Sequence, residues 1–135
     1  MARNIYIYTM IFLFGGMLYC GLELLFRGRT HLSMFIAGGI CAVLLYTIAT
    51  KSRVPAWKKW IAGGAVITTV EFIVGAIVNI ALGLAVWDYS HMRMNLMGQI
   101  SLQFFFIWII LSIPVIWISE FVDSRLAAAR GSGHD

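Results

Sequence analysis

The sequence predicts an all-α, polytopic integral membrane protein with four transmembrane helices. Of its 135 residues, 61% are hydrophobic and 12% are charged, a balance typical of a bilayer protein. The apolar residues fall into four blocks, and about 20 helical residues are enough to cross the hydrocarbon core. Within lipid such blocks are helical, because a helix satisfies its own backbone hydrogen bonds.

The first two blocks read as a helical hairpin. The first covers residues 5–26, which is longer than the core of a signal peptide, and no A-x-A cleavage site follows it. The second covers residues 34–49 and is short, but its mild flanks, Ser33 and Thr50, allow it to extend to a full span. We therefore expect two antiparallel helices joined by a polar loop.

The other two blocks read as a second hairpin. The third covers residues 60–86 and the fourth residues 100–118, in which Pro114 should kink or loosen the last turns. Both hairpins combine a small-residue helix, a polar outer loop and a returning helix that opens G-x-I, which indicates two parallel hairpins. We assign residues 1–126 to one transmembrane domain and residues 127–135 to a disordered tail.

The basic residues predict that the N- and C-termini lie in the cytoplasm. Cytoplasmic loops carry an excess of Lys and Arg. On the side of the termini the chain has seven basic residues against three on the other side, namely Arg3, Lys51, Arg53, Lys58, Lys59, Arg125 and Arg130 against Arg27, Arg29 and Arg93. We expect a multi-pass protein of the cell inner (plasma) membrane, with Trp87 and Tyr89 at the outer lipid interface.

Glu71 is the single charged residue of the third block. It lies 12 residues after Lys59 and 17 before Asp88, close to the membrane midplane. A charge there costs at least roughly 2.5–3.5 kcal/mol unless it is protonated, paired or hydrated. The acid therefore indicates either a site for a cation, an amine or a proton, or a structural hydrogen bond to a neighbouring helix.

Other polar side chains accompany Glu71. Asn79 lies on the same small-residue face of the third block, so this face is expected to contact protein. Glu23, in the first block, is spaced either to pair with Arg27 at i, i+4 or to face the same polar cavity as Glu71. Gln103 is the main polar group of the fourth block.

The loop between the third and fourth blocks is dense in hydrogen-bonding groups. Asp88 and Ser90 can cap a turn through their side-chain oxygens, and Asn95 and Gly98 suit a tight return into the next helix. The contiguity of Asp88, Ser90 and His91 argues against a hydrolytic triad. The chain has no CxxC, HExxH or P-loop motif, so we expect no metal site and no cofactor.

The same loop carries a family resemblance. Its segment VWDYSHMRMNLMGQISL resembles the WDYS…N..G.I signature of the putative ABC-transporter type IV (CmpB-like) permease family of small bacterial membrane proteins. TTVEFIVGAIVN is similar to the family's third helix, with Glu71 on its acid, and GLELLFR to its first helix, with Glu23 on its acid. Position 79 is Asn where some members carry a second glutamate. The resemblance covers most of the chain and implies four membrane helices and a transport role.

We interpret the chain as a small transporter or permease subunit that takes a cation or another small ligand. Four helices enclose little space, so a pathway needs a homo-oligomer or a partner membrane subunit, and no nucleic acid is expected as a partner. The alternatives are a membrane-embedded assembly or regulatory protein and, with less support, an intramembrane enzyme on a lipid-like substrate. The candidate substrate-binding residues are Glu71, Glu23, Asn79, Asp88, Tyr89, Asn95, Gln99 and Gln103.

Overall fold

Four long helices make up most of the described protein. The structure is a computed structural model that describes residues 2–28, 30–84, 87–88, 90–92 and 94–132, with the backbone alone at residues 2–4, 26–27 and 130–132. All four helices are long and apolar enough to cross a membrane. The predicted all-α, four-helix membrane protein is confirmed, and the lipid bilayer is its environment.

The elements follow one another as two helical hairpins with a small β-hairpin in the second. In chain order they are α1 (Ala2–Arg27), α2 (Leu32–Lys51), α3 (Ala56–Gly75), the π-helix η1 (Ala76–Ala81), β1 (Asn95–Leu96), β2 (Ile100–Ser101) and α4 (Leu102–Ser132). The two strands are antiparallel and pair Asn95 with Ser101. Because η1 continues α3, the third span ends at Ala81, before the end of the apolar block at residue 86.

Helix α4 extends well beyond the apolar block that predicted it. It runs from Leu102 to Ser132 with Pro114 inside it, so the proline does not end the helix. Residues 127–132, for which the sequence predicted a disordered tail, are helical, and residues 133–135 lie outside the described part of the chain. The segment LAAAR, residues 126–130, consists of strong helix formers, which accounts for the extension.

Local sequence explains where the helices begin and end. Gly28 follows α1 with a φ of 73°, and its amide donates to the Leu24 carbonyl at 3.1 Å, a left-handed cap that favours glycine. At the start of α2, Nδ1 of His31 accepts a hydrogen bond from the Ser33 amide at 3.1 Å. Pro55 precedes α3, where its missing amide hydrogen costs nothing.

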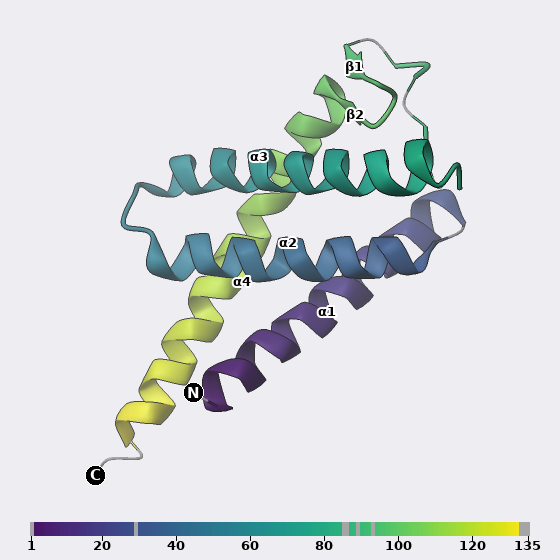
Figure 1. The fold of residues 1–135 in the computed structure, drawn as a ribbon. Coiled ribbons are helices and arrows are strands. Elements are labelled where there is room, and N and C mark those ends of the chain that lie inside the picture. Colours follow the sequence, from purple (N-terminus) through teal and green to yellow (C-terminus); the bar gives the residue numbers. More distant parts are fainter. Residues whose placement is uncertain (1, 29, 85–86, 89, 93, 133–135) are drawn as a thin grey trace.

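The helices pack as two neighbouring pairs. α1 packs along α2, while α4 crosses α3 and α2 at an angle, and α2 and α3 lie side by side and antiparallel (Figure 1). The N-terminal end of α1 and the C-terminal end of α4 lie toward the same lower-left side of Figure 1, as an even number of spans requires. The pairs α1–α2 and α3–α4 are the two predicted hairpins, and the parallel relation between them stays a prediction.

Glycines let these helices approach closely. A Cβ atom added to Gly38 of α2 would lie 2.5 Å from the Tyr19 Cβ of α1. One added to Gly63 of α3 would lie 2.5 Å from the Ser112 Oγ of α4. Such distances leave no room for a side chain, so the α1–α2 and α3–α4 contacts depend on glycine.

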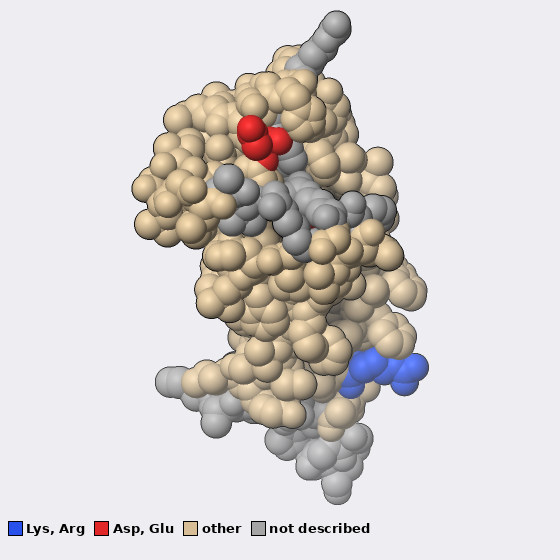
Figure 2. All heavy atoms as spheres, turned by 90° about the vertical axis from the view of Figure 1, so that its right-hand side faces the viewer, with Lys and Arg blue, Asp and Glu red and all other residues tan. Residues whose placement is uncertain are grey.

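The outer surface is mostly apolar, as lipid contact requires. Large apolar side chains such as Leu25 and Ile110 are 75% and 66% exposed. On the face drawn in Figure 2, the described acidic atoms lie in the upper part and the described basic atoms in the lower part. Helix α1 is the least enclosed of the four spans, with 6% of its most apolar stretch buried inside the protein.

Candidate functional site

Glu71 lies inside the helix bundle and has a partner on another helix. Its side chain is 5% exposed, and its Oε2 accepts a hydrogen bond from the indole Nε1 of Trp108 at 2.9 Å. Trp108 comes from α4 and packs against Tyr19 of α1 and Phe104, with ring centroids 6.1 and 5.7 Å apart. Residues of α1, α3 and α4 therefore meet around one carboxyl group.

A small cavity adjoins Glu71. Its volume is about 10 Å³, close to the room that one water molecule needs. Its walls come from α1, α2, α3 and the loop between η1 and β1: Tyr19, Met34, Ala37, Cys41, Ile67, Val70, Glu71 and Trp87. A proton or a cation of the size of water fits this space, whereas a larger ligand requires it to open.

The larger hollows of the protein lie elsewhere. One of about 450 Å³ lies between α1 and α2 and is lined by residues such as Tyr8 and Val43. Another of about 380 Å³ lies between α3 and α4 near Trp60 and Pro114. Neither is lined by Glu71, and their lining residues are mostly apolar, so they are grooves between helices and not chambers for this acid.

A second polar cluster closes the loop end of α3. The Asn79 side-chain amide donates to Gln99 Oε1 at 2.8 Å, and the Gln99 amide donates to the Met97 carbonyl at 2.9 Å. The indole Nε1 of Trp87 donates to the Gln99 carbonyl at 3.0 Å. Asn79 belongs to η1, and π-helical turns often occur at functional sites. Asn79 and Gln99, two of the candidate residues, are therefore direct partners.

Trp87 is buried, which corrects the prediction that it lies at the lipid interface. Its side chain is 4% exposed and packs with Met34 and Val78. A Cβ added to Gly75 would lie 2.8 Å from Trp87 Cζ2 and 2.5 Å from Gln99 Oε1, so glycine makes the seat for both side chains. An amphipathic indole suits a lipid interface. Here its N–H has a backbone partner inside the protein, so burying the ring leaves no hydrogen-bond donor unpaired.

The remaining loop residues hold the loop itself. Asp88 Oδ1 accepts from the Ser90 amide at 2.8 Å, and this hydrogen bond lowers the pKa of Asp88. Asn95 Oδ1 accepts from the Gly98 amide at 3.0 Å, and its Nδ2 donates to the Met92 carbonyl at 2.8 Å. Gly98 has a φ of 71°, a conformation that favours glycine. Asp88 and Asn95 thus cap the loop through their side chains, as the sequence predicted.

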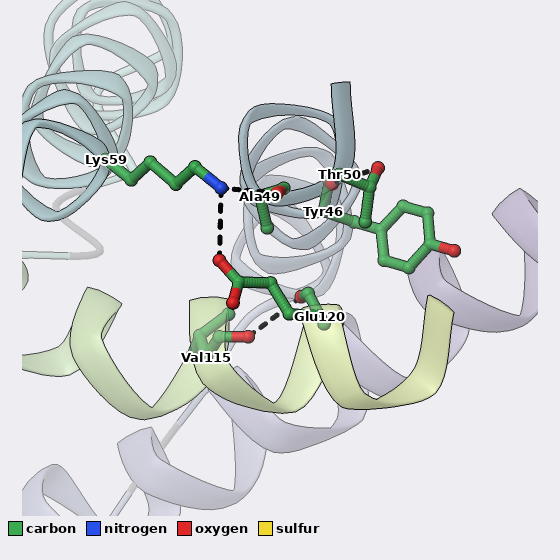
Figure 3. A network of polar contacts seen from close by, with 7 residues as sticks. Tyr46, Ala49, Thr50, Lys59, Val115 and Glu120 are labelled. Carbon is green, nitrogen blue, oxygen red and sulfur yellow. Dashed lines mark hydrogen bonds and ion pairs between the residues drawn. The ribbon is translucent and has the colours of Figure 1, made fainter. Parts of the chain in front are cut away.

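At the opposite end of the bundle, a polar network joins α2, α3 and α4. Lys59 Nζ donates to the Ala49 carbonyl at 2.7 Å and pairs with Glu120 Oε1 at 3.1 Å (Figure 3). The Tyr46 hydroxyl donates to Asp123 Oδ1 at 2.9 Å. The network lies on the side of the chain termini, away from Glu71, and its partners indicate that it holds helices together.

Of the other candidate residues, neither Glu23 nor Gln103 lines the cavity beside Glu71. Glu23 is half-buried on α1, and the Arg27 side chain of its predicted pair lies outside the described residues. Gln103 is exposed on α4, beside Met94. Tyr89 also lies outside the described part of the chain. Among the residues that are described, no three His, Cys, Asp or Glu side chains are grouped to hold a metal ion.

The residues missing from the sequence prediction are aromatic. Trp108 contributes a hydrogen bond and Tyr19 a wall to the Glu71 site, but within apolar blocks they look like lipid-facing or core residues; Trp87, a further wall, was predicted at the lipid interface. A usable signal was present for Trp108: its indole is a hydrogen-bond donor within an otherwise apolar stretch, and a buried acid needs donors.

Comparison with known proteins places the whole bundle in one family. The model of a family described as putative ABC-transporter type IV matches residues 6–130, which include α2, α3, most of α1 and α4, and the loop between η1 and α4. Comparison with curated proteins and with solved structures gives no match.

Proposed function

Because the chain belongs to the putative ABC-transporter type IV family, we propose that it is a small membrane transporter or permease subunit with Glu71 as its intramembrane acidic site. The supporting observation is the position of this carboxyl group, buried beside a cavity and hydrogen-bonded to Trp108. An indole N–H is neutral, so it orients the carboxyl group without cancelling a charge on it. An oriented acid inside a membrane is suited to binding a cation or a proton.

The size of the cavity favours the smallest of the candidate ligands. A volume of about 10 Å³ accommodates a proton carried on water or a water-sized cation. An amine with carbon substituents needs a larger opening between the helices. We therefore propose a proton or a small monovalent cation as the ligand, with Tyr19 and Cys41 in the wall of the same cavity.

The Trp108 indole resonance in ¹⁵N-labelled protein provides a direct test, with assignment by Trp108→Phe. We expect this resonance to move with pH or with added Na⁺ in the wild type and to stay fixed in Glu71→Gln, which keeps an oxygen acceptor for Trp108 but cannot titrate. Proteoliposomes should show proton or Na⁺ flux that Glu71→Gln abolishes. Glu120→Gln, which changes a distant carboxylate, is the matched control and should retain flux.

An assembly role is the second candidate, and the hydrogen bond between Glu71 and Trp108 supports it too. In that case the acid joins α3 to α4 and its charge is irrelevant. Glu71→Gln would then behave as the wild type in every assay, while Glu71→Leu would destabilise the protein by about 1–3 kcal/mol because it leaves the Trp108 donor unpaired. A folded Glu71→Gln protein with full flux would exclude the transport mechanism.

We further propose that the protein works in the inner membrane as a homo-oligomer or with a partner subunit. Four helices pack around Glu71 with little space left, so a continuous pathway needs additional helices. The charge distribution supports cytoplasmic termini. Cysteines introduced at Ser52 and Ser90 test this orientation, because only the one at Ser90 should react with a reagent added outside.

A further inference from the structure

One residue of the loop between η1 and β1, Trp87, lines the cavity beside Glu71. The other lining residues belong to α1, α2 and α3. Glu71 lies ten residues before Ala81 at the loop end of the third span and fifteen after Ala56 at the other end. At about 1.5 Å per residue these are ~15 and ~22 Å along the helix. The acid is therefore nearer to the loop side, and Trp87 lies on that side.

Polar groups continue from Trp87 toward the loop. The Trp87 indole donates to the Gln99 carbonyl, and the Gln99 side chain accepts from Asn79. Beyond them lie Asp88, Ser90 and Asn95, which are hydrogen-bonded to loop backbone and at least partly exposed. Water that enters between these groups finds hydrogen-bond partners as far as the indole of Trp87.

Toward the chain termini, the surroundings of the cavity are mostly apolar. There the cavity adjoins a hollow of about 60 Å³ whose walls are apolar except for Tyr19 and Cys41, and which includes Leu45, Leu111 and Val115. Small apolar cavities stay dry. Among its lining residues only Tyr19 and Cys41 offer an ion or a proton a polar side chain, so this route is a barrier in the described conformation.

We propose that Trp87 is the outer gate of the Glu71 site, and that a ligand reaches the acid from the loop side when the indole leaves its seat on Gly75. The inference rests on the proposed function, since it concerns access to the same acid. Gln99 and Asn79 are positioning residues in it: Gln99 holds the indole N–H, and Asn79 holds Gln99. Gly75 provides the space in which the indole and the Gln99 amide lie together.

The native thiol of Cys41 reports on this gate without requiring transport. Cys41 lines the Glu71 cavity and is buried, and it becomes the sole cysteine once Cys20 is replaced by alanine. The experiment measures the rate at which a membrane-impermeant trimethylammonium methanethiosulfonate, added on the loop side of oriented proteoliposomes, modifies Cys41. Intact-mass spectrometry gives the modified fraction over time.

Two variants open the gate by different means. Trp87→Ala removes the indole, and Gly75→Ala places a methyl group where Trp87 Cζ2 and Gln99 Oε1 now lie. Each should raise the rate of Cys41 modification from the loop side by about tenfold or more, the change expected when one buried hydrogen bond no longer opposes opening. The rate from the terminus side should not change. Trp57→Ala, at an exposed tryptophan of the opposite end, and Gly21→Ala, where an added Cβ meets nothing within 4 Å, are the matched controls.

The outcomes separate the gate from the proposed function. An unchanged loop-side rate in folded Trp87→Ala and Gly75→Ala proteins would overturn the gate, as would faster modification from the terminus side. If Trp87→Ala does not fold, Gly75→Ala alone decides. A further outcome is a raised loop-side rate together with a Glu71→Gln protein that shows wild-type flux and a Trp108 resonance that still moves with pH or Na⁺. That combination would support the gate and overturn the proposed transport function.

Discussion

Lys59 is expected to stabilise the terminus end of the bundle mainly by capping α2, and only secondarily through its ion pair. Its ammonium group donates to the carbonyl of Ala49, which lies in the last turn of α2 and has no helical amide to accept from. The same group pairs with Glu120, whose side chain is 45% exposed, whereas that of Lys59 is 12% exposed. The two partners therefore contribute unequally.

The structure gives a magnitude for each contribution. A hydrogen bond to a charged group is worth about 1.5–3 kcal/mol, and a half-exposed ion pair about 0.2–1 kcal/mol. Lys59→Met keeps the stem and loses both contacts, so it should lower the free energy of unfolding by about 2–3 kcal/mol. Glu120→Gln loses only the charge of the pair, so it should lower that free energy by about 1 kcal/mol or less.

Equilibrium unfolding in mixed detergent–SDS micelles, followed by circular dichroism, measures both changes. Lys58→Met is the matched control, because the neighbouring Lys58 is exposed and its ammonium group lies over the ring of Trp57, 5.4 Å from the ring centroid. Its cost should stay within about 1 kcal/mol. A Glu120→Gln variant as unstable as Lys59→Met would refute the capping argument and assign the stability to the ion pair.

The remaining predictions concern the loop and the helix contacts. The Ser90 amide lowers the pKa of Asp88, so the loop stability from this carboxylate is complete above the unfolded pKa and is lost as pH falls through the lowered, folded pKa. The protection factor of the Ser90 amide, which compares its exchange rate with the intrinsic rate at the same pH, should therefore fall at acid pH in the wild type and lose that dependence in Asp88→Asn; equal pH dependence of the protection factor in both would contradict it. Gly63→Ala should destabilise the α3–α4 contact by about 1–3 kcal/mol, since its methyl group would lie 2.5 Å from Ser112 Oγ. Gly21→Ala should be neutral or stabilise by up to about 1 kcal/mol in the same unfolding assay, and equal effects of the two alanines would show that the glycine contact is not tight.

Part of the site could be predicted because it depends on local chemistry. Glu71 is conspicuous in the sequence, since a charge within an apolar block has few acceptable environments in a membrane. The loop-capping roles of Asp88 and Asn95 could also be predicted, because their hydrogen-bond partners lie within a few residues in the chain. The family match supports the transport reading of the whole chain, while the ligand and the role of each candidate residue stay predictions.

Composition and the length of each apolar block determine that the chain forms four membrane helices, because transfer into lipid depends on each segment by itself. The tertiary structure decides which polar groups meet. Trp108 lies 37 residues from Glu71 along the chain, and Gln99 lies 20 residues from Asn79, so only helix packing brings these pairs together. Packing also decides that Trp87 is a buried wall of the Glu71 cavity and not a lipid anchor. An indole is suited to either place, and the choice depends on whether a distant part of the chain offers a partner for its N–H.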